Sequence, residues 1–264
     1  MTTAPASQQP GNQPRPQLDP ERDLIEQLTP NKAMVVMAHP DDCEFTVGGT
    51  VALLCSKGWE VDIVVATSGN KGTKDPEVTP QQLAGMREEE QRRASTILGA
   101  NDPVFFGFGD GELVDDDELR ALIMRQIRLR RPELVLTFDG VQPVTNHRDH
   151  RRIGISTYDA IYPAAYDLLY EPNQLREEGL LPHRPAAILF AGSASPDYHV
   201  DIEPVLRTKV QGLLAHSSQM RGRTEKGLLE MWRNRARLRM QDDDDGDGRD
   251  PVFREYFRRQ ILRR

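Results

Sequence analysis

Short apolar runs alternate with amphipathic stretches along most of the chain. Runs typical of strands occupy residues 33–38, 60–67, 103–108, 133–138 and 186–191. The first of them is apolar throughout, which is typical of a strand covered on both faces. Helical patterns occupy residues 46–57, 80–98, 115–130, 151–165 and 204–217. Four strand–helix repeats in succession predict a parallel sheet with right-handed crossovers.

Capping signals support the predicted helices. Thr79-Pro80 is suited to begin a helix, because proline favours the first helical position, and Gly99 is suited to end one. Acidic residues open the stretch 115–130 and arginines close it, as the helix dipole favours. The pattern predicts an α/β fold: a Rossmann-like sandwich with a mostly parallel sheet covered by helices on both faces, plus a C-terminal helical extension.

Composition divides the chain into three regions. Residues 1–20 are rich in Pro, Gln, Ser and Thr and hold few large apolar residues, so we expect a disordered tail. Residues 21–220 carry the strand–helix repeats and form the predicted main domain. Residues 221–264 hold thirteen basic and nine acidic residues. We predict that this last region is basic and mostly helical, with helical stretches around 231–240 and 252–264 and an acidic loop at 242–250.

Charge and cysteine content exclude several classes of protein. The net charge is −7, and without the basic C-terminal region it is about −11, which does not suit a phosphate backbone. Two cysteines, Cys43 and Cys55, are too few for a disulfide framework. The sequence shows neither a signal-peptide pattern nor an apolar run of about 18 residues. We therefore expect a cytoplasmic protein with no nucleic-acid and no membrane partner.

Residues that can carry chemistry follow two of the predicted strands. His39-Pro40-Asp41-Asp42 comes directly after the first strand, and His147, Asp149 and His150 follow the fourth. Because the carboxyl ends of parallel strands share one edge of a sheet, we expect the two segments to meet there. Two imidazoles and one carboxylate form a common catalytic zinc site, and a further carboxylate beside the metal can act as general base.

These motifs resemble the LmbE-like/PIG-L family of zinc-dependent N-acetylglucosaminyl deacetylases. The resemblance rests on His39-Pro40-Asp41-Asp42, the trailing Glu44, and His147-x-Asp149-His150, and it spans residues 34–219. Other matching positions are Gly48-Gly49, Thr67-Ser68-Gly69, Gly72-Thr73, Arg87-x-x-Glu90, Leu98-Gly99, Val200-Asp201-Ile202, Lys209 and His216-Ser217-x-Gln219. Members remove an acyl group from the nitrogen of an N-acylated amino sugar. The resemblance therefore implies that the main domain is a deacetylase of this kind.

The resemblance also implies a role for each residue of the two motifs. His39, Asp42 and His150 look like ligands of Zn²⁺ or another divalent cation, and Asp41 looks like the general base. His147, oriented by Asp149, looks like the group that stabilises the oxyanion or protonates the leaving amine. Arg87 looks like a contact to a sugar hydroxyl. A small-molecule amino-sugar substrate and a homo-oligomer, a trimer or hexamer, are implied as well.

Some residues allow two interpretations. Arg148 stands where many family members have proline; at the mouth of the cleft it would favour an anionic or strongly polar substrate, and otherwise it is a solvated arginine. Glu44 either orients a metal ligand from behind or neutralises the start of a helix. The spacing of aspartates in residues 243–248 resembles the start of a calcium loop, but Arg254 occupies the position where that loop needs Glu.

Other functions also remain open at this stage. An amidase that acts on a thiol–sugar conjugate would differ only in the acyl group. A catalytically inactive metal-binding scaffold would need neither Asp41 nor His147. A nucleotide-binding Rossmann protein is disfavoured, because its first strand–helix turn should read Gly-x-Gly-x-x-Gly.

Overall fold

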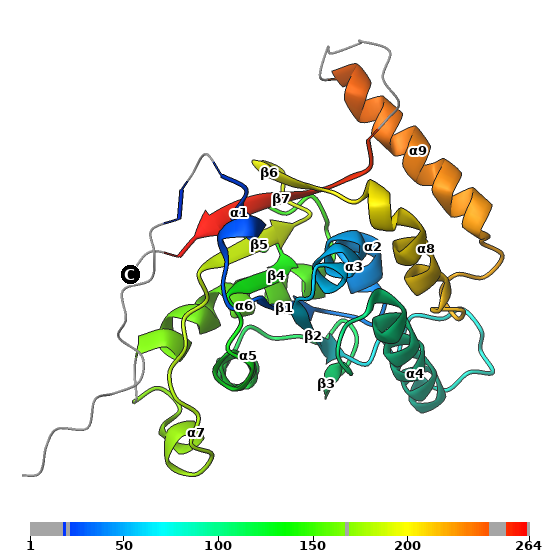
Figure 1. The fold of residues 1–264 in the computed structure, drawn as a ribbon. Coiled ribbons are helices and arrows are strands. Elements are labelled where there is room, and N and C mark those ends of the chain that lie inside the picture. Colours follow the sequence, from blue (N-terminus) through cyan, green and yellow to red (C-terminus); the bar gives the residue numbers. More distant parts are fainter. Residues whose placement is uncertain (1–17, 20–21, 167–168, 243–251, 263–264) are drawn as a thin grey trace, which may run out of the picture.

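The fold is built on one mixed sheet. The computed structural model describes residues 18–19, 22–166, 169–242 and 252–262. Seven strands within these ranges form a sheet in the order β3-β2-β1-β4-β5-β7-β6 (Figure 1). They are β1 (Lys32–Met37), β2 (Glu60–Thr67), β3 (Val104–Phe108), β4 (Leu134–Phe138), β5 (Ala187–Ala191), β6 (Tyr198–Asp201) and β7 (Arg254–Ile261). The first five strands pair in parallel, and β7 pairs antiparallel with both β5 and β6.

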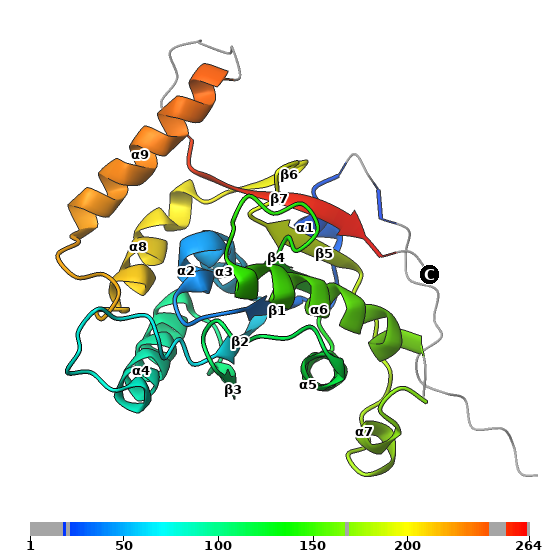
Figure 2. The same cartoon turned by 180° about the vertical axis from the view of Figure 1, so that it is seen from behind.

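Helices cover both faces of this sheet. They are α1 (Leu24–Gln27), α2 (Asp42–Thr46), α3 (Gly48–Ser56), α4 (Pro80–Leu98), α5 (Asp117–Arg130), α6 (Arg148–Tyr166), α7 (Pro172–Arg176), α8 (Leu206–Leu214), α9 (Glu225–Asp242) and a 3₁₀ turn at Glu203–Val205. One face carries α5 and α6, and the other carries α2, α3, α4 and α8 (Figure 2). The predicted Rossmann-like sandwich is thus confirmed. Within the described ranges no helix has both the length and the apolar character needed to cross a bilayer.

The core lies where the apolar strands are covered on both sides. All residues of β4 and β5, and all but the first of β1 and β2, are buried. Such strands read as continuous apolar runs in the sequence, because neither face meets water. β1 lies between β2 and β4, with Val35 opposite both Ile63 and Leu136. The carboxyl ends of β1 and β4 are therefore neighbours at one edge of the sheet.

The helix ends follow the local chemistry of the sequence. The hydroxyl of Thr79 accepts from the Gln82 amide while the Gln82 side chain accepts from the Thr79 amide, so α4 begins with a complete capping box. Gly99 ends the same helix with φ +85°, a left-handed conformation that glycine adopts without steric cost. Asp116 caps α5 by accepting from the amide of Leu119.

Two predictions about secondary structure were wrong in part. The predicted helix 46–57 is two helices, α2 and α3, and the first begins earlier, at Asp42. Residues 252–264 were predicted to be helical, but the chain forms strand β7 there. Glu255 and Phe257 are buried while Arg254 and Tyr256 on the other face are more exposed, which is the period of two that a strand requires. Arg258 lies on the face of Arg254 and Arg259 on the face of Glu255, so the alternation of polar and apolar residues is not visible in the sequence.

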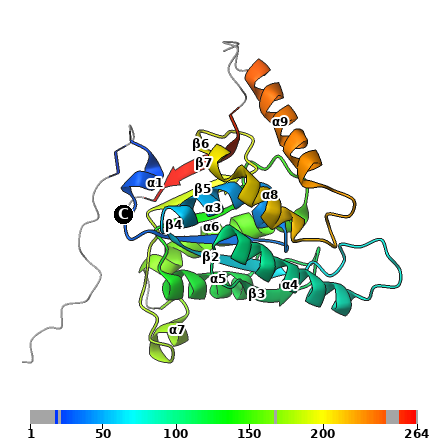
Figure 3. The same cartoon turned by 45° about the vertical axis from the view of Figure 1, so that its right-hand side comes forward.

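The rest of the C-terminal region agrees with the prediction as far as it is described. Helix α9 is present and extends away from the sheet beside α8 (Figure 3). Most of the expected N-terminal tail lies outside the described residues. The acidic loop, with its calcium-like spacing, also lies outside them except for Asp242.

Candidate active site

The first half of the site forms where β1 meets α2. The imidazole of His39 is buried, and Asp42 Oδ2 accepts from the His39 backbone amide at 2.8 Å and lies 3.1 Å from its Nδ1. Asp41 adopts φ +100°, a conformation rare for a residue with a side chain. The chain makes this sharp bend directly after Pro40. As a result the carboxylates of Asp41 and Asp42 have different partners.

The second half forms where β4 meets α6. The Phe138 ring at the end of β4 stacks on the His150 ring, with centroids 4.0 Å apart and planes inclined by 6°. His150 Nε2 lies 3.2 Å from Asp42 Oδ1. The two oxygens of Asp42 therefore face one ring nitrogen of each histidine. The expected meeting of His39, Asp42 and His150 at one edge of the sheet is present in the structure.

His147 and Asp149 have partners that differ from the expected ones. The His147 ring lies beside both other imidazoles, with its centroid 4.7 Å from that of His39 and 4.6 Å from that of His150. Asp149 was predicted to orient His147, but its carboxylate lies 3.2 Å from His39 Nε2. Only the backbone amide of Asp149 reaches His147, donating to Nδ1 at 3.2 Å. The buried Asp149 carboxylate is itself fixed by the backbone amides of Gly111 and Leu113.

Asp110 is a site residue for which the sequence allows two interpretations, a lining residue of the pocket or an ordinary loop residue. It follows β3, and its Oδ1 lies 3.2 Å from His39 Nε2, beside the Asp149 carboxylate. Its sequence signal is weak: Asp110 and Glu112 stand in the short glycine-rich loop 109–113 after a predicted strand, without a histidine beside them. The structure shows that a third strand of the sheet brings a carboxylate to the same edge.

Arg87 does not face the open side of the site. Its side chain is 4% exposed, and it donates to the carbonyls of Gly69 and Pro40 and contacts Asp41 Oδ2 at 3.2 Å. A Cβ on Gly69 would lie 2.4 Å from the Arg87 guanidinium, so glycine is required for this close approach. A contact to a sugar hydroxyl, as predicted, would need an exposed guanidinium. The guanidinium of Arg87 is instead buried beside the Asp41 carboxylate.

Glu44 belongs to a buried hydrogen-bond network behind Asp41. Its Oε1 accepts from the Gln91 amide group at 2.9 Å, and its Oε2 lies 3.1 Å from His216 Nε2. Gln91 in turn accepts from the Asp41 backbone amide at 3.1 Å. Of the two interpretations of Glu44, the contacts favour support from behind the site, because the carboxylate is turned inward and fully buried.

Arg148 lies at the rim of the site and is not free. Its Nη1 donates to the carbonyl of Gly111 at 3.0 Å, so it ties the start of α6 to loop 109–113. Lys71 reaches the same loop and donates to the carbonyl of Asp110 at 2.7 Å. The rim therefore carries two cations whose hydrogen bonds fix the loop that holds Asp110.

Electrostatics in the site favour a cation between the carboxylates. Burial lowers the pKa of His39, but the charge of Asp42 and hydrogen bonds to Asp110, Asp149 and Asp42 outweigh it and raise this pKa to about 12. Burial would raise the pKa of Asp42, yet His39 and His150 lower it well below its usual range. The ionised Asp42 and the protonated His39 show that the carboxylates stabilise positive charge at this point. A metal ion can supply that charge when it displaces the proton from His39.

The ligand atoms also suit a divalent metal. The ring nitrogens of His39 and His150 lie 3.1 and 3.2 Å from the Asp42 carboxylate, close to the separation of about 3.3 Å expected for two ligands on a tetrahedral zinc. Among the described residues, His39, His147 and His150 offer ring nitrogens that all lie within 4.8 Å of one another. Asp110 and Asp149 behind His39 match the carboxylate–histidine–metal arrangement that fixes a ligand ring. The chain thus carries a possible His/Asp metal site.

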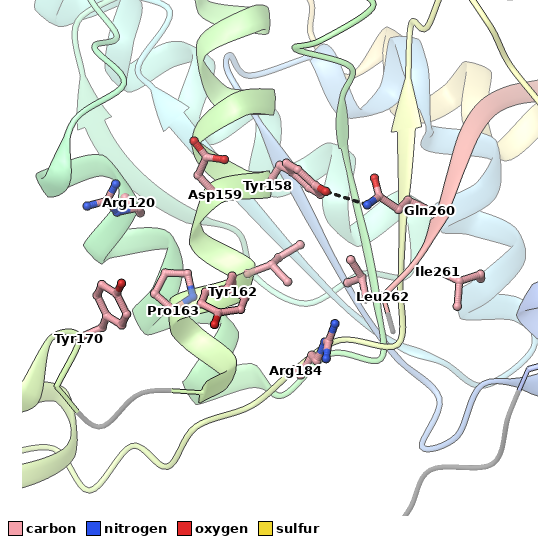
Figure 4. Close-up of a pocket in the computed structure, with 11 residues that line it drawn as sticks. Arg120, Tyr158, Asp159, Tyr162, Pro163, Tyr170, Arg184, Gln260, Ile261 and Leu262 are labelled. Atoms are coloured by element: carbon pink, nitrogen blue, oxygen red, sulfur yellow. Dashed lines mark hydrogen bonds between the residues drawn. The ribbon is translucent and has the colours of Figure 1, made fainter. Parts of the chain in front are cut away.

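A groove elsewhere on the surface is not part of this site. It measures about 630 Å³ and lies between α6 and the end of β7, lined by Tyr158, Tyr162, Arg184 and Gln260 among others (Figure 4). β7 runs antiparallel to β5, so Gln260 lies beside the start of β5. The groove therefore faces the opposite edge of the sheet from the imidazoles.

Comparison with known proteins gives the family. The family described as "PIG-L: GlcNAc-PI de-N-acetylase" matches residues 34–161, which include both histidine motifs. Diacetylchitobiose deacetylase of Thermococcus kodakarensis is 35% identical over 204 residues, covering 76% of this chain and 73% of that protein. The chain belongs to the PIG-L family.

Solved structures of PIG-L-like fold agree with the architecture. N,N'-diacetylchitobiose deacetylase from Pyrococcus horikoshii superposes with a TM-score of 0.77 at 26% identity, covering 88% of this chain and 84% of that one. The 4-carboxy-2-hydroxymuconate hydratase GalB from Pseudomonas putida KT2440 has a TM-score of 0.71 at 22% identity, covering 89% and 98%. This second likeness concerns the fold alone. It also shows that the fold does not determine the reaction, which depends on the residues of the site.

Proposed function

We propose that this protein is a metal-dependent hydrolase that removes the acetyl group from an N-acetylglucosamine-type amino sugar. The observation that carries the proposal is the convergence of His39, Asp42 and His150 beside a fourth group, Asp41, that is suited to accept a proton. Membership of the PIG-L family and the 35% identity to a diacetylchitobiose deacetylase support the same reaction.

In this proposal His39, Asp42 and His150 hold the metal. Zinc fits the two imidazoles and one carboxylate best, although another divalent cation could occupy the same ligands. Asp110 and Asp149 hold the His39 ring from behind through its Nε2. A bound divalent ion would polarise the amide carbonyl and lower the pKa of an attacking water.

Asp41 is the proposed general base. Burial and the neighbouring Asp42 raise its pKa, Arg87 opposes them, and the pKa is about 7. A carboxylate that titrates near neutral pH can take a proton from water and return it to the leaving nitrogen. Arg87 and Gln91 hold its side chain and its backbone amide, so the base has a fixed position.

His147 is the proposed oxyanion donor. Burial and the charges of His39 and His150 lower its pKa, which favours the neutral ring. Nδ1 accepts the amide proton of Asp149, which leaves the ring proton on Nε2. The neutral ring can therefore donate a hydrogen bond to a carbonyl oxygen as negative charge develops on it.

The remaining expectations also belong to the proposal. Arg148 and Lys71 at the rim suit a polar, hydroxyl-rich substrate, whereas Arg87 supports Asp41 rather than the sugar. The chain's cytoplasmic location and its assembly as a trimer or hexamer stay predictions from the sequence.

The test is acetate release together with metal analysis. Wild-type protein should release acetate from N,N'-diacetylchitobiose or another sugar in a panel of N-acetylglucosamine derivatives that includes a thiol–sugar conjugate. Asp41→Asn should keep its metal and lose at least about 100-fold in kcat. Asp102→Asn is the matched control, because that side chain is 79% exposed.

Three results would contradict the proposal. Equal acetate release by Asp41→Asn would remove the base assignment. Metal binding without turnover of any amide in the panel would support the inactive scaffold. Addition of water to a carbon–carbon double bond, with no acetate released, would place the chain with the hydratase that shares its fold.

A further inference from the structure

Strand β7 contacts the supports of both halves of the site. It lies outside the residues that match the family, yet it pairs with β5 so that Phe257 lies opposite Ala191 at the carboxyl end of that strand. The first half of β7 is therefore at the edge of the sheet where β1 and β4 also end. Alternate side chains of β7 point to opposite faces.

One face of β7 reaches the half that carries Asp42. Glu255 accepts from the backbone amides of Gly49 and Thr50 at 2.8 and 2.7 Å, which are otherwise unpaired donors in the first turn of α3. The same carboxylate pairs with the buried Lys209, whose Nζ also donates to the carbonyl of Phe45 in α2. Glu255 thus fixes the junction between α2 and α3.

The other face of β7 reaches the loop that leads to His147. Arg258 Nε and Nη2 donate to the two oxygens of Asp139 at 2.7 and 3.1 Å, a two-pronged ion pair whose carboxylate is fully buried. The guanidinium carbon lies over the Phe190 ring of β5, 4.1 Å from its centre. Asp139 also accepts from the amides of Val141 and Gln142 at 2.9 Å.

Backbone contacts continue this attachment along the loop. The Val144 amide donates to the Gly192 carbonyl at 2.9 Å, and the Ala194 amide donates to the Gln142 carbonyl at 2.8 Å. The loop from Asp139 to His147 is therefore anchored to the end of β5, and Arg258 supplies the side-chain contact at its origin.

We propose that β7 is a brace that sets the two halves of the site against each other, with Arg258 as a positioning residue for His147 and Glu255 as a positioning residue for the α2–α3 junction. The catalytic part of this inference rests on the proposed function. The mechanical part does not, because it concerns only the order of loop 139–147 and of the α2–α3 junction.

The experiment compares Arg258→Gln with Gln260→Leu. Gln260 lies on the same strand and the same face, and it donates to the hydroxyl of Tyr158 in α6 at 2.7 Å, but at the far edge of the sheet (Figure 4). Hydrogen exchange should become faster at residues 139–147 in Arg258→Gln and stay unchanged there in Gln260→Leu. With a substrate that wild type turns over, Arg258→Gln should lose at least about tenfold in kcat with KM nearly unchanged.

Two further variants keep the test decisive. Arg258→Lys keeps the charge but loses the paired hydrogen bonds to Asp139, so its exchange rate in loop 139–147 and its kcat should lie between those of wild type and Arg258→Gln. The same variant replaces Arg258→Gln if that protein does not fold. The double variant Asp139→Asn with Arg258→Gln should lose no more kcat than the worse of the two single variants. The reason is that the two residues form one ion pair, so removing the second partner removes nothing further.

The outcomes separate this inference from the proposed function. Unchanged exchange in loop 139–147 of Arg258→Gln, or equal losses in Arg258→Gln and Gln260→Leu, would overturn the brace. If wild type released no acetate, the proposed function would fail, while the exchange comparison would still decide whether β7 orders the loop.

Discussion

Asp41 depends on neighbours that its own segment does not provide. Its left-handed backbone is disfavoured for a residue with a side chain, and two residues of α4 hold it there. Arg87 binds the carboxylate and the carbonyl of Pro40, while Gln91 binds the backbone amide. Glu44 accepts from the Gln91 side chain through one oxygen, and His216 contacts its other oxygen, so the buried network continues behind Gln91. If Asp41 is the base, as proposed, these contacts hold it in position before substrate arrives.

Replacement of Arg87 should move the pH dependence of the reaction. The guanidinium lowers the pKa of Asp41, so Arg87→Met should raise this pKa further and reduce the carboxylate fraction at any given pH. The acid limb of the kcat/KM profile should therefore shift to higher pH. Arg93→Met on the exposed side of the same helix is the control and should leave the profile in place. A shift to lower pH, or none, would show that Arg87 does not act on the base.

The helix that carries His150 packs directly against the sheet. Helix α6 approaches β4 so closely that a Cβ on Gly154 would lie 2.3 Å from the Phe138 carbonyl oxygen and 2.7 Å from the Gly140 amide nitrogen. Both neighbours are backbone atoms, which cannot rotate away. This contact sets how near His150 comes to Asp42.

Gly154→Ala should therefore push α6 away from the sheet. We expect a loss of about 1–3 kcal/mol in the free energy of unfolding, as for other overpacked sites, and a loss of metal affinity. Gly85→Ala is the matched control, because that glycine lies in α4 with no atom within 4 Å of an added Cβ. It should gain up to about 1 kcal/mol. Urea unfolding of both variants measures the difference, and equal stability of the two would contradict the close-packing argument.

The sequence predicted those elements whose pattern is set by local burial. β1, β2, β4 and β5 are covered on both faces, so their apolar runs are visible without any knowledge of neighbours. Strand β7 was not predicted, because its polar side chains pair with partners that are distant in the sequence. Glu255 accepts from the start of α3, and Arg258 donates to Asp139. The short strand β6 pairs only with β7, so it was missed for the same reason.

The candidate site was predictable to a similar extent. His39, Asp42 and His150 stand in two dense motifs at strand ends, and sheet topology brings them together. Asp110 belongs to no histidine motif, and only the position of β3 explains its contact with His39. The direction of the Arg87 and Asp149 side chains could not be read from sequence spacing, because it depends on which buried polar atoms nearby still lack a partner.

At the scale of the whole molecule, the site joins two parts of the chain that are far apart in sequence. Asp149 and His39 are 110 residues apart in the sequence, and a second contact, between Asp42 and His150, joins the same two segments. A ligand shared by both halves binds only when they are assembled, so it stabilises the folded state by mass action. Thermal unfolding can therefore report the ligand set without any substrate.

Zinc added to metal-free protein at about 100 times its dissociation constant should stabilise the fold by about 2.7 kcal/mol, or raise Tm by about 5–10 °C for a chain of this size. Because the metal must displace the proton that His39 holds strongly, zinc binds more tightly as pH rises, and at a fixed zinc concentration the gain in stability should grow with pH. His150→Ala should lose the gain and His147→Ala should keep it, if Asp42 completes the ligand set. Loss of the gain in His147→Ala would instead assign the metal to the three imidazoles, since their ring nitrogens also lie within 4.8 Å of one another. In that case a different group would have to serve as the oxyanion donor.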